Sequence, residues 1–356
     1  MTASRPRRSR SSARPGAAAA ALGTLLLLGL ALLLGGGGPA GGTGETPEPS
    51  PPALAAAGPL PTAPAPVLRF ADHVSPHAVI ATAVLPAEVL DLEIGGARGA
   101  RWEARAADGQ LTRTGPAGWR WTAPPDPSPV LLGFRPSGDA EPALSLRAFV
   151  MRPYAGQEVL DGFRIGRYAG TPPPGLVEVR PGDESLPVSP HFRLGEFLSR
   201  QTAGTPQFVR LDTRLLLELE RILETVRKAG IPASTLRILS AFRTPHYNAA
   251  IGNTTTRSRH TWGDAADVFV DEDGDGRMDD LDGDGRETVA DARVLYDLIE
   301  EEVDDRGERL FLGGLGLYGP KPHRGPFVHV DVRARHPRWG AGGPAPPAVP
   351  HPRPAA

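Results

Sequence analysis

The clearest pattern of apolar and polar positions lies between residues 212 and 230. Apolar side chains recur there every three or four positions, as on one face of a helix: Leu215, Leu216, Leu219, Ile222, Leu223 and Val226. Asp212 is placed to cap the first turn, and Gly230 followed by Pro232 ends the pattern. We therefore expect an amphipathic helix whose apolar stripe belongs to a core rather than to a cofactor site.

The same part of the chain contains further elements. A second helix is predicted from about Val289 to Val303, with Thr288 as its cap. Residues 236–240 and 327–332 are short apolar runs typical of strands. Helices packed on an antiparallel sheet make an α+β domain, which we assign to residues 188–340.

Residues 68–150 show a different pattern, in which short apolar or alternating runs are separated by Gly, Pro and Asp. Several such runs predict a small all-β, sandwich-like domain with antiparallel strands. Its Trp102, Trp119 and Trp121 could stack on a glycan, but packing between strands is the interpretation that we favour. Residues 151–187 are expected to be a connector that lies against the following domain.

The N-terminal pattern indicates export. Several arginines precede an almost unbroken apolar run from Ala17 to Leu34. The run is near the lower limit for a membrane span and longer than a usual signal-peptide core. We expect residues 1–34 to be a signal anchor or signal peptide, and favour an anchor in the cytoplasmic (inner) membrane because no clear cleavage site follows. The rest of the chain would then be periplasmic or at the cell surface.

Two low-complexity segments flank the predicted domains. Residues 35–67 are rich in Pro, Ala and Gly, and are predicted to be a linker. Residues 341–356 have a similar composition and are predicted to be a disordered tail.

Composition narrows the possible partners and metal ligands. The chain has 356 residues, enough for two domains, and a net charge of −2, which gives no bulk attraction to nucleic acid. Cysteine is absent, which excludes disulfides, thiolate ligands and a lipoprotein. A metal site in this chain must therefore use imidazoles and oxygen ligands.

Candidate metal ligands lie in two blocks. His260 and Asp267 are seven positions apart across a small-residue turn, and His329 lies in the predicted strand 327–332. Two imidazoles and one carboxylate, with a fourth position left for water, are the ligand set of a catalytic zinc site. Zinc in such a site polarises a carbonyl and acidifies water, so metal-assisted hydrolysis is expected, most simply of a peptide bond.

These blocks resemble those of the zinc D-Ala-D-Ala carboxypeptidase and murein endopeptidase family. Five ordered segments carry the resemblance, among them Ser-x-His-x-x-Gly-x-Ala-x-Asp, Gly-Gly-x-Gly-x-Tyr and Phe-Val-His-x-Asp: residues 191–198, 240–248, 258–267, 313–318 and 327–331. The last segment is similar to the murein-endopeptidase branch. The resemblance implies a fold shared with the hedgehog signalling domain, Zn²⁺ held by His260, Asp267 and His329, and peptidoglycan stem peptides as the substrate.

The resemblance leaves the general base open. Many members have an acidic residue three positions before the last zinc-binding His, where this chain has Pro326. Asp331 would lie on the same strand face as His329, and could act as the base or could orient a ligand. His323 and Asp264 are weaker candidates for the base.

Further residues are predicted to line or support the site. Arg243 is expected to stabilise an oxyanion or to hold a substrate carboxylate, and the alternative is an ion pair with the acidic insertion described next. Ser258 and Asn248 are expected to fix a loop by hydrogen bonds, and Tyr318 to line the cleft.

An acidic insertion at residues 271–287 separates the two metal blocks. Its first half has acids at positions 1, 3, 5 and 9 of a calcium loop and glycine at the sixth: Asp271, Asp273, Asp275, Asp279 and Gly276. Asp282 stands at the twelfth position, and the run through Asp282 and Asp284 repeats the first half. One or two structural Ca²⁺ ions are expected, and the alternative is a solvated acidic loop.

Together these patterns predict a zinc metallopeptidase that cleaves D,D or L,D bonds of murein as an endopeptidase or a carboxypeptidase. The alternative is a non-catalytic murein-binding module, or a calcium-dependent surface module, on the same fold.

Overall fold

The computed structural model describes residues 65–96, 100–202, 204–253, 255, 257–302 and 310–340. The predicted targeting segment 1–34, nearly all of the linker 35–67 and the tail 341–356 lie outside these residues. Among the described helices, none has the length and apolar character needed to cross a membrane.

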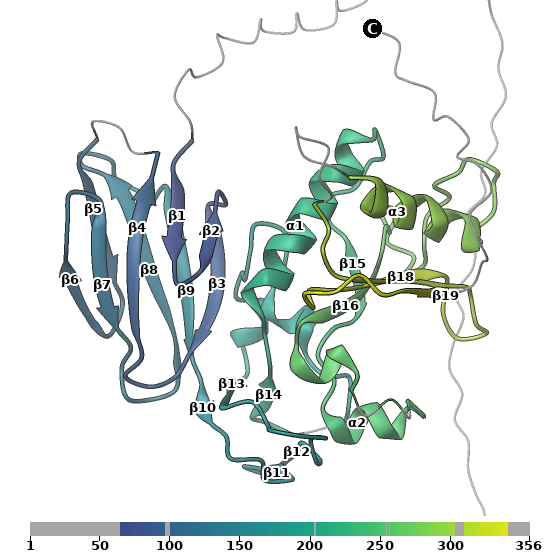
Figure 1. Ribbon diagram of the computed structural model, residues 1–356, viewed down its shortest axis with the longest axis horizontal. Coiled ribbons are helices and arrows are strands. Elements are labelled where there is room, and N and C mark those ends of the chain that lie inside the picture. The colour runs from purple at the N-terminus through teal and green to yellow at the C-terminus, as the bar shows by residue number, and fades with distance from the viewer. Residues whose placement is uncertain are drawn as a thin grey trace, which may run out of the picture. The chain divides into compact units, whose positions relative to one another are not determined.

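The N-terminal β region contains two sheets, with strand orders β2-β1-β4-β7-β6 and β3-β9-β8-β5 (Figure 1). Their strands are β1 Val67–Phe70, β2 His73–Ser75, β3 Val79–Val84, β4 Val89–Gly95, β5 Trp102–Ala106, β6 Gln110–Arg113, β7 Gly118–Thr122, β8 Ser128–Pro136 and β9 Leu144–Val150. Trp102, Trp119 and Trp121 are at most 3% exposed, so packing inside the region is confirmed and stacking on a glycan is excluded.

One pairing departs from the expected antiparallel pattern. Strand β3 runs parallel to β9, with Ile80 opposite Leu146. A parallel pair needs a long crossover connection, and the five strands between β3 and β9 along the chain supply it. Such a pairing depends on the order of the strands in space, which local apolar patterns do not encode.

Residues 152–209 form short strands and turns: β10 Arg152–Pro153, β11 Val159–Leu160, β12 Phe163–Arg164, β13 Gly175–Val179, β14 Gln207–Val209, and the 3₁₀ turns Asp183–Ser185 and Leu194–Phe197. This segment contacts the loops that carry the predicted site. The Tyr168 hydroxyl donates to the Thr261 carbonyl at 3.0 Å, and the His246 amide donates to the Ile165 carbonyl at 2.9 Å.

The C-terminal part is α+β. Its sheet has the order β15-β16-β18-β17-β19, built from β15 Arg237–Ser240, β16 Ala265–Phe269, β17 Gly314–Tyr318, β18 Phe327–Asp331 and β19 Arg338–Gly340. The helices are α1 Thr213–Lys228, α2 Pro245–Ala250 and α3 Val289–Glu301, and a 3₁₀ turn, η3, spans Arg259–Trp262. Helices α1 and α3 contact each other, and α3 packs on β17 and β18 (Figure 1).

The two long helices begin where the sequence predicts. The Asp212 side chain accepts a hydrogen bond from the Arg214 amide, and the six apolar residues of the predicted stripe are buried in the core. Thr288 caps α3 as expected. A buried Leu side chain contributes about 1.5–3 kcal/mol, so the stripe is the main reason that α1 is stable in this position.

Candidate metal centre

Three predicted ligands meet at one point of the sheet. The Nε2 atom of His260 lies 3.1 Å from Nδ1 of His329 and 3.2 Å from Oδ1 of Asp267. Nδ1 of His329 lies 2.8 Å from the same Asp267 oxygen. All three residues are at most 6% exposed. Ligand atoms around a tetrahedral zinc, with bonds of about 2.0–2.1 Å, would be about 3.3 Å apart, so the donor set fits this ion closely.

Backbone geometry sets these positions. Asp267 on β16 and His329 on β18 are directly opposite each other in the antiparallel register, so their side chains share one face of the sheet. His260 comes from η3, and the chain turns back toward β16 at Gly263, where φ is +68°. A Cβ atom at Gly263 would overlap the Arg210 carbonyl oxygen. This position therefore requires glycine, which explains the small residue between the two ligands.

Each ligand is oriented by a partner behind it. Nδ1 of His260 lies 2.6 Å from the Ala241 carbonyl oxygen and donates to it, so Nε2 carries the free lone pair. Nε2 of His329 lies 3.2 Å from an Asp331 oxygen, which directs Nδ1 to the other ligands. The second oxygen of Asp267 accepts a hydrogen bond from the Arg243 guanidinium. These partners hold the three ligand atoms in place before a metal binds.

The comparison with protein families agrees with this geometry. The sequence model of the Peptidase M15 family, a family of zinc D-Ala-D-Ala carboxypeptidase-like enzymes, matches residues 190–281. Residues 190–281 of this chain are therefore similar to the Peptidase M15 family. The match includes His260 and Asp267, and His329 lies beyond its end. No curated protein and no solved structure matches the chain.

The charges of the three candidate ligands are set by their burial and by one another. Burial alone would raise the pKa of Asp267, but the neighbouring His260 and His329 imidazoles hold it well below its usual range. Burial lowers the pKa of His260, and the Asp267 charge offsets this only in part. Burial alone would lower the pKa of His329 as well, but its hydrogen bonds to Asp267 and Asp331 raise it. The site therefore presents an ionised carboxylate and a neutral His260 imidazole, which are forms that bind zinc, and zinc has to compete with a proton at His329.

Asp331 is buried and engaged on both oxygens. Besides His329, it accepts hydrogen bonds from the Arg333 guanidinium at 2.7 and 2.6 Å and from the Gly314 amide at 3.2 Å. Burial alone would raise the pKa of Asp331, but the hydrogen bonds from His329 and Arg333 hold it far below its usual range. A general base works best with a pKa near the operating pH, so this geometry favours the orienting role that the sequence left open.

Arg243 lies at the metal ligands rather than in the acidic insertion. Its Nε donates to Ser240 Oγ at 2.8 Å while its terminal nitrogen binds Asp267. Its backbone amide also donates to the His260 carbonyl at 3.1 Å. Arg243 thus links two of the three ligands, and its guanidinium lines the cleft beside them.

The other predicted residues divide between two cavities. Ser258 and Tyr318 line a cleft of about 460 Å³ that opens onto the three ligands. Asn248 is buried, and it lines a separate cavity of about 230 Å³ with Tyr168 and Trp262. The weaker base candidates are not in the cleft: Asp264 pairs with the Arg259 guanidinium, and His323 is exposed elsewhere.

Sequence reasoning missed several residues of the cleft wall, among them Trp339 and Arg257. Trp339 on β19 packs its ring 5.1 Å from that of His329, and its Nε1 donates to the Tyr318 hydroxyl at 2.8 Å. Arg257 also lines the cleft and has no carboxylate partner within the described part of the chain. In the sequence, Trp339 is an isolated tryptophan near the tail and Arg257 is one of many arginines, so neither could be assigned to the site.

The acidic insertion contains two groups of carboxylates whose oxygens lie within 4.8 Å of one another. The first combines Asp271, Asp273 and Asp279, and the second combines Asp280, Asp282 and Asp291. Asp275 instead accepts a hydrogen bond from the Arg277 amide at 2.8 Å, and the backbone amide of Asp284 donates to the Asp282 carboxylate at 3.1 Å. Asp291, at the twelfth position of the second repeat, was not predicted. The twelve-residue spacing from Asp280 would have identified it.

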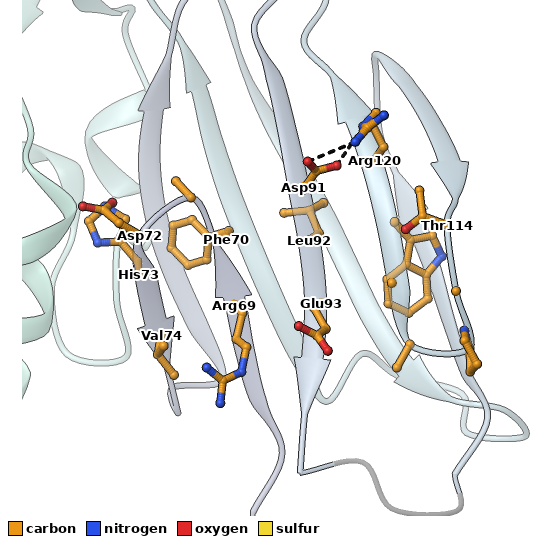
Figure 2. Close-up of a pocket in the computed structure, with 16 residues that line it drawn as sticks. Arg69, Phe70, Asp72, His73, Val74, Asp91, Leu92, Glu93, Thr114 and Arg120 are labelled. Atoms are coloured by element: carbon orange, nitrogen blue, oxygen red, sulfur yellow. Dashed lines mark hydrogen bonds and ion pairs between the residues drawn. The ribbon is translucent and has the colours of Figure 1, made fainter.

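A surface cavity of about 810 Å³ lies in the β region and is lined by none of the candidate metal ligands. Figure 2 shows Arg69, Glu93 and the paired Asp91 and Arg120 along strands β1, β4 and β7. The charged atoms of Asp91 and Arg120 are 2.7 Å apart, and both side chains of this pair are exposed. An exposed pair of this kind contributes little to stability and leaves no free buried group for chemistry, so the group of His260, Asp267 and His329 remains the candidate site.

Proposed function

We propose that this chain is a zinc-dependent peptidase that hydrolyses stem peptides or cross-links of peptidoglycan. The observation that carries the proposal is the group of His260, Asp267 and His329, oriented from behind and open to a cleft in front. Zinc, when bound, polarises the scissile carbonyl and acidifies water. The described residues supply three ligands, which is the number typical of catalytic rather than structural zinc sites.

The residues around the ligands define what the chain itself contributes. Ala241, Arg243 and Asp331 hold the three ligand atoms, so little reorganisation is needed during the reaction. Trp339 and Tyr318 form an aromatic wall over which a peptide backbone can lie. Apart from the three candidate ligands, the described lining contains no carboxylate or imidazole that could act as a base.

The charge of the cleft supports a substrate that carries carboxylates. Four arginines line it, Arg243, Arg257, Arg259 and Arg333, and Asp267 is the only acidic residue in its described lining. Three of them are engaged with Asp267, Asp264 and Asp331, which leaves Arg257 available to bind an anionic group. Stem peptides of peptidoglycan carry such carboxylates. The N-terminal arginines and apolar run support export to the compartment that contains this polymer.

The test is digestion of purified murein by the full-length protein, with the released peptides resolved by mass spectrometry. Peptide release should stop with phenanthroline, which removes zinc and leaves calcium, and should return when zinc is restored. His260→Ala should remove both zinc and activity, and casein should stay intact because its bonds join L-residues. If murein stays intact although the protein holds stoichiometric zinc, the proposed peptidase function is wrong.

A non-catalytic murein-binding module is the second candidate, since Pro326 replaces the acid of many relatives and Asp331 is fully engaged. Sedimentation with sacculi without peptide release would favour this module. Retained activity of Asp331→Asn would instead favour a peptidase whose cleft needs no such base.

A further inference from the structure

The segment that follows β16 contains a buried carboxylate oxygen without a partner. The Asp271 side chain is fully buried, and its Oδ1 accepts no hydrogen bond. The other oxygen accepts the Gly276 amide at 3.2 Å, and the nearest cation is the largely exposed Arg237, 3.8 Å away. A buried carboxylate oxygen without a partner is costly, and it therefore indicates a missing positive ligand.

The surroundings of Asp271 supply the remaining ligands for a hard cation. One carboxylate oxygen from each of Asp271, Asp273 and Asp279 lies within 4.8 Å of the other two. These residues stand at the first, third and ninth positions of a calcium loop, and Gly276 at the sixth has φ of +86°. A loop of several carboxylates suits Ca²⁺, which accepts about 6–8 oxygen ligands in flexible geometry, better than Mg²⁺, which needs near-ideal octahedral geometry and keeps several waters.

We propose that Asp271, Asp273 and Asp279 bind one Ca²⁺ ion, which stabilises the strands that carry the proposed zinc ligands. Two contacts connect this calcium site to those strands. The Asp279 amide donates to the Val270 carbonyl at 3.0 Å, which closes the loop directly behind β16. The next residue back, Met278, is fully buried, and a Cβ atom on Gly325, just before β18, would lie 3.5 Å from its amide.

The second acidic group does not qualify in the same way. The buried Asp291 carboxylate already accepts amides from Leu281 at 2.7 Å, Asp282 at 3.3 Å and Thr288 at 2.6 Å. It is therefore satisfied as the cap of α3. This difference makes Asp282 a matched control, because it is an aspartate of the same insertion outside the proposed calcium site.

The test measures calcium binding and thermal unfolding of the full-length protein. Titration calorimetry with CaCl₂ should give one ion at the Asp271 site. At a hundredfold excess over Kd, the melting temperature should rise by roughly 5–10 °C, because the ion binds only the folded state. MgCl₂ and matched NaCl should give a smaller rise. A wild-type protein whose melting ignores Ca²⁺ would overturn the proposal.

Variants make the assignment specific. Asp271→Asn should raise the melting temperature without calcium, because it removes a buried charge, and should abolish the calcium response. Asp273→Ala changes an exposed residue and should lose the response in a folded protein. Asp282→Asn should keep it. An equal loss in Asp282→Asn, or a full response in Asp273→Ala, would overturn the assignment.

The effect of calcium on the zinc site is measured separately, and it rests on the proposed zinc function. The melting test needs neither zinc nor activity. Transfer of zinc to a chromophoric chelator should be slower with Ca²⁺ present than without it. If zinc is released at the same rate in both conditions while calcium still raises the melting temperature, calcium does not stabilise the zinc site.

Discussion

Replacement of Asp331 by asparagine separates the two roles open to this residue. The side chain is fully buried and receives hydrogen bonds from His329, Arg333 and Gly314. Asparagine keeps the shape and one acceptor oxygen, but replaces the other oxygen with an amide donor. If that donor faces His329, the imidazole must accept through Nε2, and its proton moves to Nδ1. Nδ1 is the atom that faces Asp267 and His260, so the ring would lose its metal-binding lone pair.

The structure sets the size of the expected effect. Loss of an orienting carboxylate behind a metal-binding His lowers metal affinity by about 10–100-fold, or about 1.4–2.7 kcal/mol. Arg333 also loses its partner. Its side chain is 31% exposed, so we expect a stability loss of about 1–3 kcal/mol, below the 3–5 kcal/mol of a fully buried pair.

The assay is zinc competition against a chromophoric chelator, followed by murein turnover at saturating zinc. An orienting Asp331 predicts weaker zinc binding and turnover that largely recovers when zinc is saturating. A catalytic base predicts normal zinc affinity and a loss of about 10²–10⁴ in turnover, and that outcome would refute the reasoning. Arg333→Gln is the control for zinc affinity: it breaks the ion pair, keeps the contact between His329 and Asp331, and should bind zinc nearly as tightly as wild type.

Three further substitutions test the surrounding structure. Gly263→Ala should cost at least about 1–2 kcal/mol for the positive φ and more for the overlap with Arg210, and calorimetry should show a lower melting temperature together with weaker zinc binding. Leu219→Ala should cost about 2–5 kcal/mol in urea unfolding because the side chain is fully buried in the core, and a cost near zero would contradict the packing. Gly316→Ala would place a Cβ 2.6 Å from the Trp339 ring, so it should shift the Trp fluorescence and lower turnover while zinc is retained.

The sequence predicted elements whose signal is local. Helix α1 has an apolar period, a cap at Asp212 and a Gly-Pro end, and all of these act within the segment itself. The three candidate metal ligands were also named from local motifs, although their meeting depends on the pairing of β16 with β18. His260 and Asp267 lie on either side of one turn, and His329 lies inside one short strand.

Features that depend on distant pairing were not predictable. Trp339 reaches the metal cleft because β19 pairs in parallel with β17, opposite Gly316. A spacing of two residues also does not specify that the Arg333 guanidinium donates to the Asp331 carboxylate, which is buried in the folded protein. The unpartnered oxygen of Asp271 likewise becomes visible only when the core has closed around it.

The arrangement behind the ligands favours catalysis over a purely structural zinc. Ala241 and Arg243 lie in one turn after β15, so a single segment orients both His260 and Asp267, while Asp331 orients His329 from the neighbouring strand. A structural site closes around its metal with four protein ligands, whereas the described residues here offer three and a cleft of about 460 Å³ in front of them. Hydrogen bonds therefore fix the three ligands from behind, and the cleft leaves them accessible from the front. Such an arrangement keeps one coordination position accessible to substrate, and a site with only a structural role would gain nothing from it.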